Sequence, residues 1–251
     1  MPSYLSLVLP AYNEARRLPA AIEKLGEFVR AFQRPVEVLI VVERSTDGTL
    51  DLAREAAAGQ GDSAPSIVVI DNGPQRGKGF AVRSGMLRAS GEFVFYMDAD
   101  LSVPLQEVLA FVDHFEANPT IDVLVGNRQH PRSQIVRAQS WLRRTMGQSF
   151  NWLLSALTLA NVGDTQCGFK AFRRRVLQPV FGAQRIDGFA FDVEVLSLAA
   201  MMGFRVEDMP VVWINSPDSR VRIVRDSVRM LRDSVRIRNA LRLQPVSRRK
   251  R

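Results

Sequence analysis

The sequence predicts an α/β protein with a mostly parallel central sheet, because strand-length apolar runs alternate with stretches of helical periodicity. The runs are rich in Val, Ile, Leu and Phe, as strands are when helices cover both faces of a sheet. They lie at Leu5 to Leu9, Val36 to Val42, Ile67 to Ile70, Phe93 to Met97 and Val123 to Val125. This alternation predicts βαβ units through about residue 126.

The stretches between the runs place apolar residues three or four positions apart, which is the spacing of one helix face. They lie at Leu18 to Phe32, Leu50 to Ala57, Phe80 to Leu87 and Val108 to Phe115. The pattern after residue 126 is less regular. It predicts a helix from about Arg137 to Leu159, a strand at Phe169 to Phe172, a helix at Asp192 to Met202 and a strand at Val206 to Ile214.

Positive charge is concentrated at the end of the chain. Residues 220–251 hold eleven Arg and one Lys against two Asp, a net charge of +10, which leaves −2 of the total of +8 for residues 1–219. The spacing of five apolar residues predicts an amphipathic helix in this tail, with Ile223, Met230 and Ile237 widening its apolar face. The five are Val221, Val224, Val228, Leu231 and Val235.

A basic amphipathic tail favours an anionic membrane surface as partner. Two alternatives stay open. The helix could simply dock on its own domain, or the arginines could bind nucleic acid, although few aromatic residues accompany them for stacking on bases. The longest apolar stretch, Trp152 to Val162, is too short to span a bilayer. With a single cysteine, Cys167, we expect a cytoplasmic protein that binds the inner face of the membrane peripherally.

Polar clusters follow the first four predicted strands, at the sheet edge where open parallel sheets bind ligands. They are Pro10-Ala11-Tyr12-Asn13-Glu14, Glu43-Arg44-Ser45-Thr46-Asp47-Gly48-Thr49, Asn72 to Lys78 and Asp98-Ala99-Asp100. An Asp-x-Asp motif alone is weak evidence, because chance produces it often. Its position at a strand end beside three other polar clusters predicts a shared site.

Two carboxylates at a strand end suit Mg²⁺ or Mn²⁺, which would neutralise a departing nucleoside diphosphate. We expect Asp100 to be the direct metal ligand and Asp98 to assist it or reach the ribose. The alternative is that the pair caps a helix starting near Pro104.

Two further loops have both a structural and a functional interpretation. Ser45 and Asp47 can cap the following helix while the turn presents Glu43 to the donor base or ribose. The Arg76-Gly77-Lys78-Gly79 segment combines glycines that permit close backbone approach with cations that suit a diphosphate at a helix N-terminus.

Together the four clusters resemble the donor-site motifs of family 2 glycosyltransferases with the GT-A fold. Four further segments look most like the dolichyl-phosphate beta-glucosyltransferase branch. They are Phe95 to Ser102, Asp164 to Lys170, Phe189 to Glu194 and Val212 to Asn215. The resemblance implies inverting transfer of a glucose-like sugar, with UDP as the preferred nucleotide, to a polyprenyl phosphate. From the change of pattern near residue 126 and the basic tail, we expect a donor half at residues 1–126, an acceptor half at 127–218 and a tail at 219–251.

One segment departs from the family pattern. Val42, Glu43 and Arg44 stand where the family usually has Asp-Asp-Gly after the second strand. Glu43 can keep one carboxylate, but the change makes UDP a preference only.

The chemical class of the acceptor, hydroxyl or phosphate, determines which residues we expect to take part in catalysis. A hydroxyl acceptor needs a general base, for which Asp192 is the first candidate and Asp164 the second. A phosphate acceptor is already ionised and needs arginines to position it. Arg128, Arg132 and Arg137 resemble an acceptor-phosphate segment, although solvated arginines would look the same. A soluble transferase with a hydroxyl acceptor is therefore the main alternative, ahead of a nucleic-acid-binding module or a sugar nucleotidyltransferase.

Overall fold

The computed structural model describes residues 3–59, 66–136, 158–214 and 230–237. Its main sheet has seven strands in the order β3-β2-β1-β4-β7-β5-β8. These are β1 (Leu5–Ala11), β2 (Val36–Val42), β3 (Ser66–Asp71), β4 (Phe93–Met97), β5 (Val123–Asn127), β7 (Phe169–Arg173) and β8 (Val206–Pro210). Strands β1 to β4 pair in parallel, β7 runs antiparallel to both β4 and β5, and β8 is parallel to β5. The mostly parallel sheet predicted from the sequence is confirmed.

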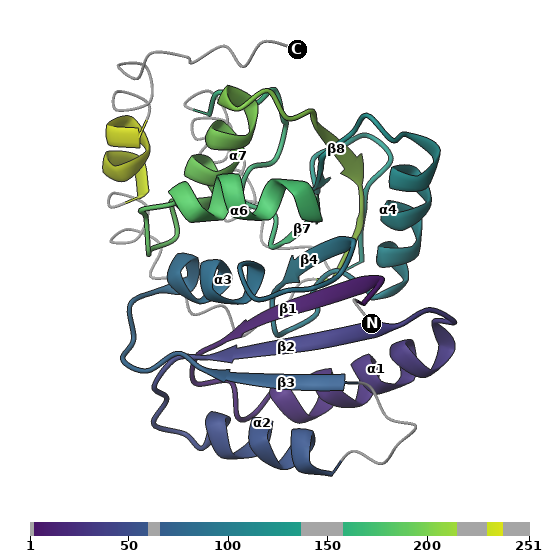
Figure 1. The fold of residues 1–251 in the computed structure, drawn as a ribbon, viewed down its shortest axis with the longest axis vertical. Coiled ribbons are helices and arrows are strands. Elements are labelled where there is room, and N and C mark those ends of the chain that lie inside the picture. The colour runs from purple at the N-terminus through teal and green to yellow at the C-terminus, as the bar shows by residue number, and fades with distance from the viewer. Residues whose placement is uncertain (1–2, 60–65, 137–157, 215–229, 238–251) are drawn as a thin grey trace.

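Helices cover both faces of this sheet (Figure 1). The helices with bounds in the structure are α1 (Leu18–Ala31), α2 (Thr49–Ala58), α3 (Lys78–Met86), α4 (Gln106–Ala117), α6 (Arg174–Ala183) and α7 (Phe191–Met201). Residues of α3, α6 and α7 share one apolar cluster, and residues of α1, α2 and α4 share the other. Along β1, Val8 enters the first cluster while Leu7 and Leu9 enter the second. Both faces are therefore buried, which is why the strands read as unbroken apolar runs.

A second, two-stranded sheet lies beside the end of the main one. Its strands are β6 (Gln134–Ile135) and β9 (Val212–Trp213), which pair in parallel. We had predicted a single strand from Val206 to Ile214, but Pro210 ends β8 and the chain continues after Val211 as β9. A proline cannot donate to a strand ladder, so it is typical of such a break.

Two other elements differ from the prediction. Helix α6 was not predicted, since Pro179 lies inside it and proline normally ends a helix pattern. The direction of β7 was not predicted either, because strand direction depends on partners far apart in the sequence. The helix expected from Arg137 to Leu159 falls outside the described residues except for Thr158 and Leu159, which are not helical.

The tail is helical where it is described, over residues 230–237. The buried residues are Met230, Ser234 and Ile237, and the two apolar ones belong to the cluster shared with α6 and α7. Val235, predicted as part of the apolar face, is 41% exposed. In the described part of the predicted apolar face, Met230 and Ile237 are therefore buried as expected, and Val235 is not. Residues 219–229 and 238–251 lie outside the described part, as does most of the stretch from Trp152 to Val162, and no helix among the described residues is long and apolar enough to cross a membrane.

Candidate active site

The predicted polar clusters meet at one edge of the sheet. Strands β1, β2, β3 and β4 are parallel, so the segments that follow them leave the sheet on the same side. Strand β5 has the same direction, which adds Arg128 to this edge, and the antiparallel β7 brings in the residues that precede it. The first cluster overlaps β1, since Pro10 and Ala11 belong to the strand. Pro10 is tolerated there because the pairing of β1 with β4 ends at Val8, before the proline.

The first two loops are bound to each other. Asn13 has a positive φ of 53°, a conformation that asparagine adopts more readily than most residues. Its side-chain oxygen accepts the Thr46 N–H at 2.8 Å, and its own N–H donates to the Ser45 hydroxyl at 3.0 Å. The Ala15 N–H donates to Asp47 at 3.1 Å. These contacts make the two loops one unit.

Asp47 also bonds the start of α2, as predicted. Its carboxylate accepts the Thr49 N–H at 3.2 Å, although the residue at the cap position is Gly48, with a positive φ of 82°. Ser45 does not cap the helix: its hydroxyl accepts the Asn13 N–H instead of an N–H of α2, and it donates to the Glu43 carbonyl at 2.9 Å. The Glu14 N–H donates to the Thr49 hydroxyl at 2.8 Å.

Glu43 faces the protein rather than an open surface. Its carboxylate is buried and accepts the backbone N–H groups of Arg76 and Gly77, both at 2.9 Å. Burial raises the pKa of this carboxyl, while the two backbone bonds oppose the rise. The structure thus gives Glu43 a part in shaping the third loop, and its contact with the donor base or ribose stays a prediction.

The Arg76 to Gly79 segment is packed against the residues that precede α7. The Arg76 guanidinium pairs with Asp187 at 2.7 Å and stacks over the Phe80 ring at 3.8 Å. A Cβ atom on Gly77 would meet the Asp187 carbonyl at 2.5 Å, and one on Gly79 would meet the Ile186 carbonyl at 2.6 Å. The two glycines therefore permit close approach to the protein's own backbone, whereas we had expected approach to a diphosphate.

Lys78 connects this loop to the Asp-x-Asp motif. Its ammonium group lies 2.6 Å from the Asp98 carboxylate. Burial alone would lower the pKa of Lys78, but the charges of Asp98 and Asp192 outweigh it and raise the pKa. Lys78 is therefore a cation at neutral pH. It lies at the first residue of α3, close to the predicted metal ligands.

Asp100 is held in a tight turn. Its carboxylate accepts the Ser102 N–H at 3.0 Å and the Ser102 hydroxyl at 2.8 Å, and it lies 3.6 Å from the Arg17 guanidinium. The alternative that the aspartates cap the next helix does not hold, because α4 begins at Gln106 and has no side-chain cap. Both carboxylates belong to the strand-end loop itself.

Asp192 lies in a buried ion pair. The ammonium group of Lys170, which is fully buried, donates to the Asp192 carboxylate at 2.6 Å and to the Cys167 carbonyl at 2.7 Å. The Tyr96 hydroxyl donates to the same carboxylate oxygen as Lys170. Asp192 thereby joins β4, β7 and the first turn of α7. Next along α7, buried Glu194 accepts the Ile186 N–H at 2.8 Å.

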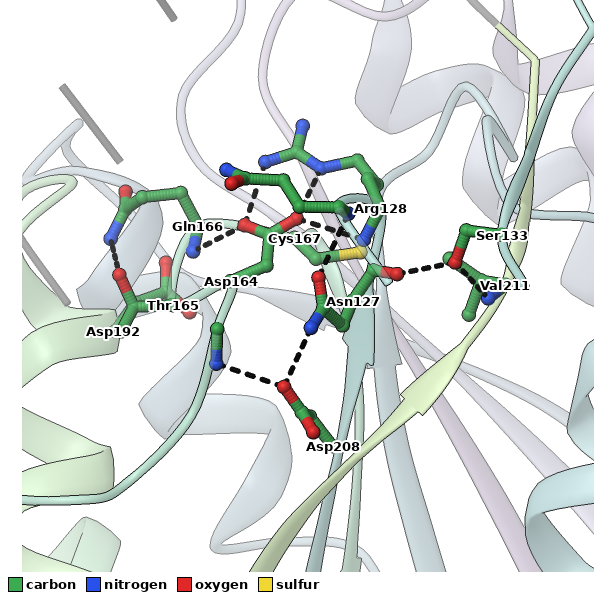
Figure 2. A network of polar contacts seen from close by, with 12 residues as sticks. Asn127, Arg128, Ser133, Asp164, Thr165, Gln166, Cys167, Asp192, Asp208 and Val211 are labelled. Carbon is green, nitrogen blue, oxygen red and sulfur yellow. Dashed lines mark hydrogen bonds and ion pairs between the residues drawn. The ribbon is translucent and has the colours of Figure 1, made fainter. Parts of the chain in front are cut away.

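Asp164 and Arg128 form a second ion pair (Figure 2). The fully buried Asp164 carboxylate accepts Nε of Arg128 at 2.7 Å, Nη2 at 3.0 Å and the Arg128 backbone N–H at 3.1 Å. Burial alone would raise the pKa of Asp164, but the Arg128 charge outweighs it and lowers the pKa. Arg128 itself is 28% exposed, so part of the guanidinium is accessible while the rest is fixed.

Neighbouring bonds hold this pair in place (Figure 2). The Asp208 carboxylate of β8 accepts the Asn127 amide at 2.7 Å and the Gly163 N–H at 2.8 Å. The Ser133 hydroxyl donates to the Asn127 carbonyl at 2.5 Å and accepts the Val211 N–H at 3.0 Å. The end of β5, the segment before β7 and the β8–β9 connection are therefore joined.

Comparison with known proteins identifies the family. Residues 6–181 match the model of glycosyl transferase family 2. The chain belongs to this family. A dolichyl-phosphate beta-glucosyltransferase of Dictyostelium discoideum is 30% identical over 243 residues, which cover 94% of this chain and 74% of that protein. One from Saccharomyces cerevisiae is 29% identical over 238 residues, which cover 90% and 71%. This glycosyltransferase spans 66 to 74% of the length of such relatives.

Solved structures share its fold. Glucosyl-3-phosphoglycerate synthase from Mycobacterium tuberculosis, in complex with Mn²⁺, uridine diphosphate and glucosyl-3-phosphoglycerate, matches with a TM-score of 0.64 at 17% identity, over 98% of this chain and 82% of that one. Mannosyl-3-phosphoglycerate synthase from Rubrobacter xylanophilus matches with a TM-score of 0.65 at 19% identity, over 99% and 78%. The predicted GT-A fold of this glycosyltransferase is confirmed.

The carboxylate ligands that this glycosyltransferase offers fit one hard cation. Asp98 and Asp100 supply two carboxylates from one turn, and Mg²⁺ or Mn²⁺ is commonly bound by one or two carboxylates together with diphosphate oxygens and water. Among the described residues, no group of three or more His, Cys, Asp and Glu could hold a metal ion.

The other predicted residues are accounted for as follows. Arg132 is exposed, and its backbone N–H donates to His130 at 3.1 Å. Arg137 lies outside the described residues. Cys167 is a packed thiol, as expected, and burial raises its pKa to about 11. No metal, donor or acceptor contact of the individual predicted residues is tested by these observations, so their roles stay predictions.

Gly168 is a site residue that our sequence reasoning did not single out. Its carbonyl accepts the Asp98 N–H at 3.1 Å, and a Cβ atom there would lie only 2.0 Å from a carboxylate oxygen of Asp98. A glycine directly before a predicted strand was the available signal, but its contact with Asp98 depends on the pairing of β4 with β7.

Replacing Gly168 by alanine is expected to displace the Asp98 carboxylate and lower transfer on the order of 10²-fold, the loss typical of an ångström-scale misplacement. Steady-state rates at saturating donor and Mn²⁺ measure it. Gly182→Ala is the matched control, because a Cβ atom there meets nothing within 4 Å. Equal rates for the two variants would show that the Asp98 position is unimportant.

Proposed function

We propose that this protein is an inverting glycosyltransferase that moves a glucose-like sugar from a UDP-sugar to a polyprenyl phosphate at the cytosolic face of a membrane. Its family and the names of its relatives support glycosyl transfer to a dolichyl-type phosphate. Structural neighbours bound to uridine diphosphate support the donor, and those that also hold Mn²⁺ support the metal.

The proposal of a phosphate acceptor rests on one observation: both carboxylates that could act as general base are already bound to other side chains of the protein. Asp192 is bound to Lys170 and Tyr96, and Asp164 to Arg128. A carboxylate whose pKa is lowered, as that of Asp164 is, makes a weak base. A hydroxyl acceptor would need one of these carboxylates to take its proton. A phosphate acceptor needs none, and the partly exposed Arg128 suits it.

The chemistry follows from these positions. An acceptor phosphate oxygen attacks the anomeric carbon of the sugar from the face opposite the leaving group, the bond from that carbon to the diphosphate breaks, and UDP departs with the bonding electrons. Lys78 offers a positive charge beside the departing diphosphate, and Arg128 holds the attacking phosphate. A divalent ion on Asp98 and Asp100 would supply Lewis-acid stabilisation of the leaving group.

A pair of acceptors that differ only in the phosphate tests this proposal. With UDP-glucose and Mn²⁺, farnesyl phosphate is expected to accept the sugar, while farnesol is expected to leave the donor unused except for slow hydrolysis. Both products are separated by chromatography of a radiolabelled sugar. Faster transfer to farnesol than to its phosphate would support the hydroxyl-acceptor alternative and refute our proposal.

We also propose that the basic tail holds the enzyme at an anionic membrane. Arg232 and Arg236 have side chains that are 60% and 68% exposed, while Met230 and Ile237 pack into the apolar cluster. The helix can therefore keep its packing and still present arginines to lipid headgroups. Deleting the whole tail would remove core residues, so substitution of the exposed arginines is the cleaner test.

Replacing Arg232 and Arg236 together by glutamine is expected to weaken sedimentation with anionic liposomes about thirtyfold, since each basic residue near such a surface contributes roughly 1 kcal/mol. About 0.5 M salt should have the same effect on the wild type. Arg34→Gln with Arg54→Gln is the control, because these arginines are exposed to a similar degree elsewhere. Tighter retention on duplex DNA than on liposomes would favour a nucleic-acid-binding tail.

A further inference from the structure

Trp213 lies between the metal motif and the acceptor arginine. Its ring centre is 5.7 Å from the central carbon of the Arg128 guanidinium. The same side chain lines a small pocket together with Asp98 and Gly168. A group held between the donor sugar and Arg128 would therefore lie near this indole. In the sequence, Trp213 lies in the segment from Val212 to Asn215 that resembles the dolichyl-phosphate beta-glucosyltransferase branch.

The apolar surface continues from Trp213 along the small sheet. Ile135 of β6 is the direct partner of Trp213 in β9, so the two side chains point to the same face of the sheet. Ile135 is 41% exposed. Isolated apolar residues on a surface need no explanation. Here, however, the exposed isoleucine adjoins an aromatic ring that contacts the predicted phosphate-binding arginine.

Backbone bonds fix this surface relative to the site. The Gln134 N–H donates to the Val211 carbonyl at 3.2 Å, and the Val136 N–H donates to the Trp213 carbonyl at 3.0 Å. The Ile214 N–H donates to the Ser102 carbonyl at 2.7 Å, which ties β9 to the loop that carries Asp100. The position of Trp213 relative to the metal motif is therefore set by the fold rather than by a ligand.

We propose that Trp213 and Ile135 bind the first isoprene units of the acceptor and thereby select a lipid phosphate over a small soluble phosphate. The inference rests on the proposed function, since it assumes that the acceptor phosphate binds Arg128. One ester oxygen joins the phosphate to the first isoprene unit, so that unit must lie within a few bond lengths of the arginine. Among the described residues, Trp213 contacts the arginine, and Ile135 is the strand partner of Trp213. A small hydrophilic phosphate would gain nothing from them.

The test measures how acceptor efficiency depends on chain length. Wild-type enzyme is assayed with UDP-glucose, Mn²⁺ and three acceptors of increasing length: dimethylallyl, geranyl and farnesyl phosphate. We expect kcat/KM to rise along the series, because each isoprene unit removed from water favours binding. Trp213→Ala should lower kcat/KM for farnesyl phosphate about tenfold or more, mainly through KM, and Ile135→Ser about fivefold, values typical of lost apolar contacts.

The short acceptor dimethylallyl phosphate distinguishes the effect of contacts to the isoprenoid chain from the effect of contacts to the phosphate. For this short acceptor, Ile135→Ser should lower kcat/KM by a smaller factor than it does for farnesyl phosphate, because the single isoprene unit ends at Trp213. Val68→Ser is the matched control, since Val68 is 42% exposed on β3, at the opposite edge of the main sheet. It should behave as wild type with every acceptor.

The outcomes distinguish this inference from the proposed function. If wild-type enzyme uses no polyprenyl phosphate, the proposed function fails. If it uses farnesyl phosphate but Trp213→Ala and Ile135→Ser retain the full dependence on chain length, the proposed function stands and the inference is wrong. Loss of that dependence in both variants supports the inference.

Discussion

Replacing Asp100 by asparagine is expected to reduce sugar transfer on the order of 10³-fold with little change in stability. The substitution removes one of two carboxylates that fit a divalent ion, and with it charge stabilisation of the leaving diphosphate. The fold should persist because an asparagine oxygen can still accept the bonds from the Ser102 N–H and hydroxyl. Initial rates across a Mn²⁺ titration and a thermal melt measure the two effects.

Asp71→Asn is the control for this variant. Asp71 also ends a strand of the parallel sheet, but its carboxylate is exposed and pairs with Arg54 at 3.1 Å. It should retain wild-type turnover and metal dependence. Wild-type turnover in Asp100→Asn at limiting Mn²⁺ would overturn the assignment of Asp100.

Replacing Arg128 by alanine is expected to affect both activity and stability. Transfer to a short polyprenyl phosphate should fall on the order of 10²-fold or more, since the group that positions the phosphate is lost. The free energy of unfolding should fall by roughly 3–5 kcal/mol, because the buried Asp164 carboxylate would lose its countercharge. Arg128→Lys separates the effects, as it retains a charge near Asp164 but loses the two-pronged contact.

The loss of transfer activity in Asp192→Asn is compared with the loss in Arg128→Ala. If Asp192 only holds β4, β7 and α7 together, the variant should lose activity by less than about tenfold with a phosphate acceptor, whereas loss of a general base typically costs 10²–10⁴-fold. Because the variant leaves the buried Lys170 without the countercharge of Asp192, the double variant Lys170→Met with Asp192→Asn serves as the charge-neutral version. An Arg128→Ala variant that transfers normally, beside a crippled Asp192→Asn, would remove the phosphate-acceptor account.

The donor half was predictable because its signals are local. Apolar runs and helix periodicity located β1 to β4 and the helices between them, and parallel pairing then required the polar clusters to share one edge. The direction in which each polar side chain points was not predictable. Glu43 turns toward the backbone of Arg76 and Gly77, and Lys78 toward Asp98, because of loops that meet only in the folded chain.

The second half was less predictable for the same reason. The pairing of Arg128 with Asp164 joins residues 36 positions apart, and that of Lys170 with Asp192 joins residues 22 apart. Helix α6 has a proline inside it, and its existence depends on apolar residues that pack against α7 and the sheet. In the tail, the buried face depends on which residues the domain offers for packing, so periodicity identified Met230 and Ile237 but wrongly included Val235.

The structure of the product tests inverting transfer to a polyprenyl phosphate most directly. Enzyme is incubated with UDP-glucose, farnesyl phosphate and Mn²⁺, and the lipid fraction is examined by phosphorus and proton NMR. We expect glucose joined through its anomeric carbon to the lipid phosphate, in the β configuration that follows from inversion of the donor's α linkage. An α-linked product, or free glucose with unmodified farnesyl phosphate, would contradict it.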